Sequence, residues 1–277
     1  LASIAPSFSQ SREIEDRRSI WPPEYRQGPP AKGRSGRYRR SSKPTEATPN
    51  VSPGMLGITI WRLRPSQATD QARILVTKNN AKTPWTPERV SADTTFSEGQ
   101  LVRLSVEVPR TGYLYVIDRE QYADGSTSDP YLIFPLNSSG TPFKVAKARI
   151  VELPGSSDET PGFEFNSYRK DGPPQTAELL TFIVSPEPIP ELRLASSNGS
   201  PVKLMRSLAE DLEARWGTNA EQLEFEGGSG RAYTPAERNA AKNRALTNGD
   251  LPPQTVFRLN AKPGSPYAIK LPLRITS

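Results

Sequence analysis

The chain has 277 residues, enough for one large domain or two small ones, and no stretch approaches the roughly 18 consecutive apolar residues of a membrane-spanning helix. It contains no cysteine and no histidine, which excludes disulfides, Cys or Ser-His nucleophiles, and metal sites with Cys or His ligands. The chemistry that remains is that of carboxylates, lysine, tyrosine and hydroxyl side chains. We therefore expect no enzyme activity and no cofactor.

Residues 1–54 differ in composition from the rest and are predicted to form an extended, basic, proline-rich arm, followed by a domain over residues 55–277. Ten basic and five acidic residues lie in the first 50 positions, whereas the other 227 positions carry 26 and 25. Residues 26–43 include seven basic side chains and no acidic one. Such a segment buries too little apolar surface to offset the entropy lost on ordering, so alone it is expected to be extended or disordered.

Two interpretations of the arm stay open. It is either a solvated linker or an attachment element that docks on a protein or anionic surface. The second is favoured because isoleucine, tryptophan and tyrosine side chains in the arm are costly to leave in water. The residues predicted to bind the partner are Ile14, Ile20, Trp21, Tyr25, Arg34, Arg37, Tyr38, Arg39 and Arg40.

From residue 56 onward, short runs rich in β-branched and aromatic residues alternate with turn residues. In residues 101–108, polar and apolar side chains alternate with the period of two that is typical of a strand with one buried face. The link at 109–112 favours an antiparallel hairpin with residues 112–118. Strands are predicted over residues 57–63, 72–77, 101–108, 112–118, 131–135, 148–153, 162–168, 178–185, 255–261 and 267–275.

Two helices are predicted near the C-terminal end of the chain. Residues 203–216 place leucines and a tryptophan four residues apart, which gives one apolar stripe, and Gly217 follows as a C-terminal stop. Thr234, Pro235 and Glu237 form the pattern of a capping box at the start of a second, weaker helix. The chain is therefore predicted to be mainly β, an antiparallel β-sandwich with one or two inserted helices.

Several segments resemble a known bacterial family. They are residues 85–89 (WTPER), 96–104 (FSEGQLVRL), 112–118 (GYLYVID), 124–126 (DGS) and 130–135 (PYLIFP). In order and spacing they are similar to the domain of unknown function 4384, and residues 178–190 and 267–274 resemble its later strands. The resemblance implies a β-rich accessory module of exported bacterial proteins, sometimes found beside caspase-like peptidase domains. It implies no catalytic residue.

The start of the chain also bears on location. Leu1 stands where Met would begin a newly made protein, and a chain without cysteine is compatible with an oxidising compartment. Both features fit a mature exported protein. We expect an extracytoplasmic location in a bacterium: the periplasm, the cell surface or the medium.

Acidic residues between positions 118 and 129 invite two further interpretations. Asp118, Asp124 and Asp129, with Glu120, are candidate calcium ligands, but their spacing does not match an EF-hand, and an Asp-Gly turn between strands explains them without an ion. Asp118 and Glu120 are also weak candidates for an acid and base in glycoside hydrolysis, because such carboxylates usually come from separate strands. The aromatic residues Tyr113, Tyr115, Tyr122, Tyr131 and Phe134 are candidates for a sugar-binding platform, although core or sheet packing explains most of them better.

Two function classes remain. The favoured one is a non-catalytic interaction or structural module of the cell envelope or extracellular space, attached through its arm to a neighbouring protein or to a copy of itself. The alternative is a binding module for an anionic or carbohydrate polymer. Nucleic acid is not expected as a partner, because the domain outside the arm has almost no net positive charge.

Overall fold

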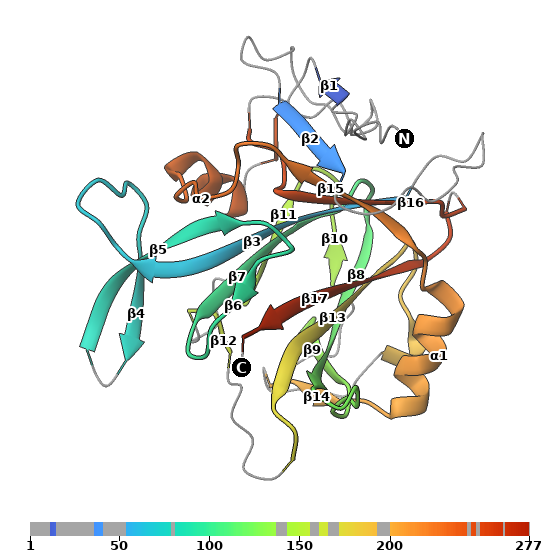
Figure 1. The fold of residues 1–277 in the computed structure, drawn as a ribbon. Coiled ribbons are helices and arrows are strands. Elements are labelled where there is room, and N and C mark those ends of the chain that lie inside the picture. The colour runs from blue at the N-terminus through green and yellow to red at the C-terminus, as the bar shows by residue number, and fades with distance from the viewer. Residues whose placement is uncertain are drawn as a thin grey trace, which may run out of the picture.

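The computed structural model describes residues 12–14, 36–40, 54–78, 81–136, 143–155, 161–165, 172–192, 200–242, 245–247, 250–262 and 264–276. These residues form two β-sheets packed face to face, with two α-helices outside the sheets (Figure 1). The predicted fold class, a mainly antiparallel β-sandwich with inserted helices, is confirmed. Neither helix of the described part is long and apolar enough to cross a membrane.

Among the residues that the structure describes, the first sheet has ten strands. Its main path runs β1 (Arg12–Ile14), β2 (Gly36–Arg40), β15 (Ala220–Phe225), β16 (Thr255–Leu259), β3 (Gly54–Pro65), β5 (Ala81–Val90) and β4 (Ile74–Lys78). The long β3 pairs on one side with β16 and then β5, and on its other side with β7 (Leu101–Glu107). Strands β11 (Ile150–Leu153) and β12 (Phe163–Glu164) pair with the far side of β7.

The second sheet has seven strands in the described part. Its path runs β14 (Val202–Lys203), β9 (Tyr131–Phe134), β8 (Gly112–Tyr122), β13 (Gln175–Ser185), β17 (Tyr267–Ile275) and β6 (Thr95–Phe96), and β10 (Lys144–Val145) pairs with β8. The central strands β8 and β13 pair over ten register positions. The second sheet is antiparallel except for the β6 and β17 pair.

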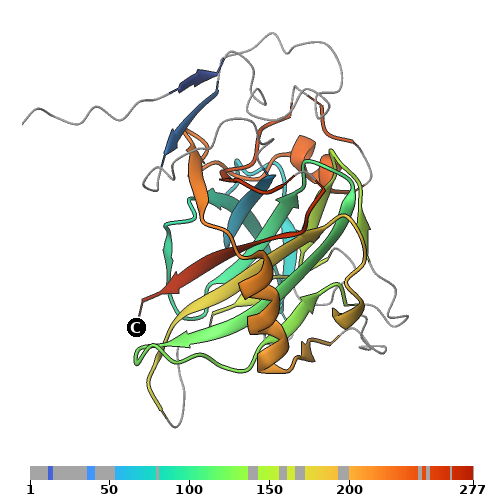
Figure 2. The same cartoon turned by 90° about the vertical axis from the view of Figure 1, so that its right-hand side faces the viewer.

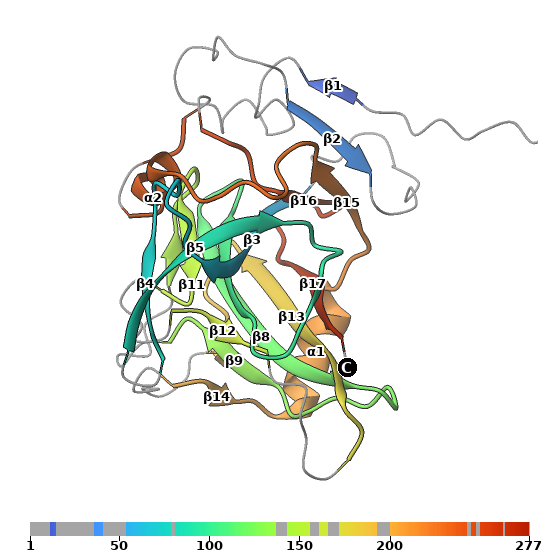
Figure 3. The same ribbon diagram turned by 60° about the vertical axis from the view of Figure 1, so that its left-hand side comes forward.

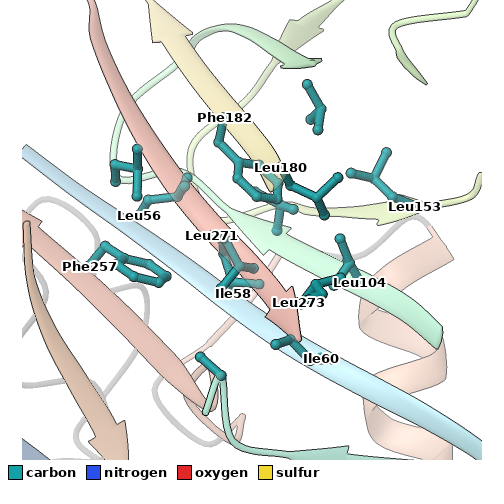
Figure 4. Packing of buried hydrophobic residues seen from close by; sticks show 14 of the residues in the cluster. Leu56, Ile58, Ile60, Leu104, Leu153, Leu180, Phe182, Phe257, Leu271 and Leu273 are labelled. Atoms are coloured by element: carbon teal, nitrogen blue, oxygen red, sulfur yellow. The ribbon is translucent and has the colours of Figure 1, made fainter. Parts of the chain in front are cut away.

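Alternate residues of both sheets meet in one core (Figure 4). Leu56, Ile58, Ile60 and Leu104 come from the first sheet, and Leu180, Phe182, Leu271 and Leu273 come from the second. All eight are at most 3% exposed. The period of two that the sequence shows in residues 101–108 is thus the inward face of β7, with Val102, Leu104 and Val106 buried.

Helix α1 (Arg206–Trp216) covers the outer face of the second sheet (Figure 2). Leu212 and Ala209 are completely buried against Tyr115, Ile117 and Ile183. Glu213 of α1 also accepts a hydrogen bond from Thr181 at 3.1 Å and pairs with Lys270 at 2.6 Å, which fixes the helix across β13 and β17. The predicted apolar stripe is therefore correct, but the helix starts at Arg206 because Val202 and Lys203 pair with β9.

Helix α2 (Pro235–Lys242) lies over the outer face of the first sheet, where Tyr233 packs edge-on against Trp61. The predicted capping box is confirmed. The Thr234 amide donates to Glu237 Oε2 at 2.8 Å, and the Glu237 amide donates to Thr234 Oγ1 at 3.2 Å. The glycine-rich turn before the helix, residues 227–230, contacts β5, because the Gly230 amide donates to the Arg89 carbonyl at 2.8 Å.

The predicted hairpin of residues 101–118 is wrong. Strands β7 and β8 belong to different sheets, so the link at 109–111 carries the chain from one layer to the other. β7 is flanked by β3 and by β11 and β12, while β8 is flanked by β13 and by β9. A short link is compatible with a hairpin and with a connection between two sheets. The pairing of β7 with β3, and of β8 with β13, decides between the two.

Candidate functional site

The most informative contact of the predicted arm is with its own domain. Strand β2 adds to the edge of β15, with Tyr38 opposite Phe225 and Arg39 opposite Glu224 (Figure 3). β1 lies beyond it as the outermost strand of the main path. The sheet therefore extends across the predicted boundary at residue 54, because residues 36–40 are one of its strands.

Tyr38 anchors this strand. Its side chain is 4% exposed, its hydroxyl donates to the Pro253 carbonyl at 2.8 Å, and its ring centroid lies 5.5 Å from that of Phe225. The surrounding cluster contains Met55, Leu223, Phe225 and Val256, with Leu251 packed against it. Since Leu56 and Phe257 face the sandwich core, this cluster lies on the opposite, outer face of the first sheet.

The structure describes the other predicted partner-binding residues to different extents. Arg39 alternates with Tyr38 and is exposed. Ile14, Arg37 and Arg40 lie in described strands, but their side chains are outside the description. Ile20, Trp21, Tyr25 and Arg34 lie outside the described residues, so their roles stay predictions.

The candidate calcium ligands do not converge. Asp124 Oδ1 accepts hydrogen bonds from the Ser126 amide at 2.9 Å and its hydroxyl at 2.6 Å, as expected for an Asp-Gly turn. Asp129 pairs with Lys203 at 2.5 Å, and this contact lowers the pKa of Asp129. Asp118 faces the space between the sheets. Among the described residues, no three carboxylates are grouped as metal ligands would be.

Asp118 instead lies beside Glu178, a residue that the sequence did not single out. Asp118 is opposite Leu180 and Glu178 is opposite Glu120 in the pairing of β8 with β13. Burial raises the pKa of Asp118. The pKa of Glu178 is also raised, chiefly by burial and to a smaller extent by the charge of Asp118. Alternation could have placed both carboxyls on the inward face, but only the strand register brings them together.

Tyrosine positions support packing rather than a sugar platform. Tyr115 is 1% exposed and its hydroxyl accepts a hydrogen bond from the Ile189 amide at 3.0 Å. Tyr122 is also buried, and its hydroxyl donates to Glu120. Of the four tyrosines, Tyr131 is the exposed one.

A small cavity lies between the first sheet and the α2 segment, with both apolar and charged side chains in its lining. Its walls include Trp61, Arg89 and Glu107 on the sheet side and Tyr233 and Glu237 on the helix side. Its volume of about 20 Å³ is enough for about one water molecule and too small for an organic substrate.

One wall of this cavity is a buried ion pair. The Arg89 guanidinium donates to Glu237 Oε1 from Nη2 at 2.7 Å and from Nε at 3.0 Å, and Nη1 donates to the Pro252 carbonyl at 2.9 Å. The guanidinium carbon also lies 5.1 Å from the centroid of the Trp61 ring. Arg89 therefore joins β5 to α2 and to the segment after it, which is a structural role.

The fold and these contacts define a two-layered β-sandwich to whose edge an N-terminal strand is added. Comparisons of the chain with protein-family models, with curated proteins and with solved structures found no match. The resemblance to the domain of unknown function 4384 stays a prediction.

Proposed function

We propose that this chain is a non-catalytic interaction module of the bacterial cell envelope or extracellular space. Its N-terminal arm attaches it to a neighbouring protein, for which a second copy of the chain is the first candidate. The observation that carries the proposal is the addition of β2 to the edge of β15 with Tyr38 buried as its anchor.

Anchoring at β2 changes what the rest of the arm can do. Because residues 36–40 are held on the domain, the residues before them start from a fixed point at the sheet edge, and this lowers the entropy lost when they bind a partner. The outer side of β1 is the end of the sheet's main path in the described part. A strand edge that has no partner strand can pair with a strand from another chain.

The remaining predicted anchors supply the binding energy in this proposal. Burial of Ile20 and Trp21 would contribute about 1.5 to 3 kcal/mol each before ordering costs. Exposed Arg39 and the other basic residues of the arm would orient it against acidic groups of the partner. Charge would then set the rate and direction of binding, while the apolar anchors would set its strength.

A non-catalytic role is supported by the geometry of the titratable groups. The cavity beneath α2 holds about one water. Its Arg89 and Glu237 are already bonded to each other and to main-chain atoms. The Asp118 and Glu178 carboxyls, whose pKa values are raised, face the apolar core and not this cavity.

The alternative function is binding of an anionic or carbohydrate polymer. The observation that supports this alternative is the excess of basic residues in the arm.

Light scattering tests the attachment and separates the two functions. The wild-type chain is expected to have a mass above that of the monomer at both low and high salt, because apolar anchoring is little screened. The double variant Ile20→Ser/Trp21→Ser is expected to be monomeric with an unchanged thermal transition. Leu75→Ser, which removes an exposed apolar side chain from β4, is the matched control and should assemble like the wild type.

The salt dependence decides the alternative. Retention on an anionic polymer that falls steeply with salt, with no self-association, would favour the polymer-binding module. A wild-type chain that is monomeric in every condition, with residues before 36 rapidly cut by protease, would leave the solvated linker as the role of the arm.

A further inference from the structure

The two carboxyls Asp118 and Glu178 occupy the inward face of the central strands of the second sheet. Val116 and Leu180, two positions away from them on the same strands, are part of the sandwich core. Asp118 is opposite Leu180, so Asp118 and Glu178 are diagonal neighbours on one face. Side chains at such positions are within reach of each other.

One oxygen on each carboxyl lacks a partner. Asp118 Oδ1 and Glu178 Oε2 are buried, and neither has a hydrogen-bond partner among the described residues. Two ionised carboxylates offer only acceptors, so they cannot satisfy each other. A single proton converts one of them into a donor, and an O–H···O bond then satisfies both oxygens.

The surroundings favour a proton over a positive ion. Asp118 and Glu178 are also influenced by the negative charge of Glu120. This charge disfavours ionisation of both carboxyls. The Arg119 amide and the Gln175 side chain donate hydrogen bonds to the pair. The neighbour of Glu178 on β17 is the apolar Leu273, and the neighbour of Asp118 on β9 is Tyr131.

We propose that Asp118 and Glu178 hold one shared proton at neutral pH, and that this proton links β8 to β13 and makes the sandwich more stable in acid than in alkali. Loss of the proton leaves two negative charges side by side in the core. The pair is thus a pH-sensitive device built into the fold, and it does not depend on the function of the arm.

The direction of the pH effect follows from linkage. The pKa of Glu178 in the folded chain is raised above its ordinary value of 4.5, chiefly by burial and then by the Asp118 charge. Above pH 4.5 the unfolded chain releases this proton while the folded chain retains it. Stability is therefore fully present below that value and is lost as the pH rises through the raised pKa of the pair.

Urea unfolding of the full-length chain between mildly acidic and alkaline pH tests the proposal. The folding equilibrium constant of the wild type should fall by up to about tenfold per pH unit in the range where the proton is held only by the folded chain. Glu178→Gln should flatten this dependence and should be the more stable chain in alkali, because its amide donates to Asp118 permanently. Glu210→Gln, an exposed change on α1, is the control and should follow the wild type.

Infrared spectroscopy of the folded protein gives a readout that a purely structural role would not change. The wild type should show the carbonyl band of a protonated carboxyl at neutral pH, and both Glu178→Gln and Asp118→Asn should lack it. Absence of this band in the wild type would overturn the proposal even if neither variant folded. Equal pH profiles for wild type and Glu178→Gln, or calcium stabilising the wild type alone, would also overturn it.

Discussion

Replacement of Arg89 by methionine is expected to destabilise the fold by about 3 to 5 kcal/mol, because it leaves the Glu237 carboxylate buried without its ionic partner. The Arg89 and Glu237 side chains are only 3% and 9% exposed, so bulk water does not reach the carboxylate. The one water that the adjoining cavity can hold is neutral and cannot replace the charge of the guanidinium. Arg89→Met also removes the donor to the Pro252 carbonyl and the cation above the Trp61 ring. Urea unfolding followed by tryptophan fluorescence measures the effect.

A second variant separates the effect of the unpaired Glu237 charge from the effect of the lost Arg89 packing. Arg89→Met/Glu237→Gln removes the charge but keeps a side chain that accepts the capping bonds of Thr234. This double variant should regain a substantial part of the loss. A change of less than about 1 kcal/mol for Arg89→Met alone would show that the ion pair does not hold α2 on the sheet.

Leu212→Ala is expected to cost about 2 to 5 kcal/mol, because it opens a cavity between α1 and the second sheet. Leu212 is completely buried in a cluster with Tyr115, Ile117 and Ala268. The same substitution at Glu210, which is exposed on the same helix, should cost less than about 0.5 kcal/mol. Denaturant unfolding of the two variants side by side gives the comparison.

The comparison controls for helix propensity, since alanine favours a helix at both positions. Equal losses for Leu212→Ala and Glu210→Ala would mean that α1 is not packed on the sheet as described. The Glu213 contacts with Thr181 and Lys270 would then need to account for the position of the helix.

Local patterns predicted much of this fold. Alternation found β7, the stripe of leucines found α1, and the capping box found α2, because each is a property of neighbouring residues. β5 was missed since Pro84 and Pro87 argue against a strand, yet the carbonyls of both accept hydrogen bonds from outside β5. β15 was missed because its glutamates break the apolar pattern.

The rest depends on contacts between distant residues. Whether β7 and β8 form a hairpin is decided by β3 and β13, which lie on either side of them in the chain. From the sequence, Tyr38 is predicted to belong to the basic arm. In the structure it is buried against Leu223 and Phe225 of β15. Asp118 was noticed for its acidic neighbours in sequence, but its partner Glu178 is 60 positions away.

Hydrogen exchange of the full-length chain at low and high protein concentration tests the attachment most directly. We predict slow exchange for the amides of β2 at both concentrations, because the strand is bound to its own domain, and slower exchange for residues 18–25 at high concentration only. Tyr38→Ala should release β2 while β8 and β13 keep their protection. Fast exchange of β2 in the wild type, or no effect of concentration on residues 18–25, would contradict attachment to a second copy through an anchored arm.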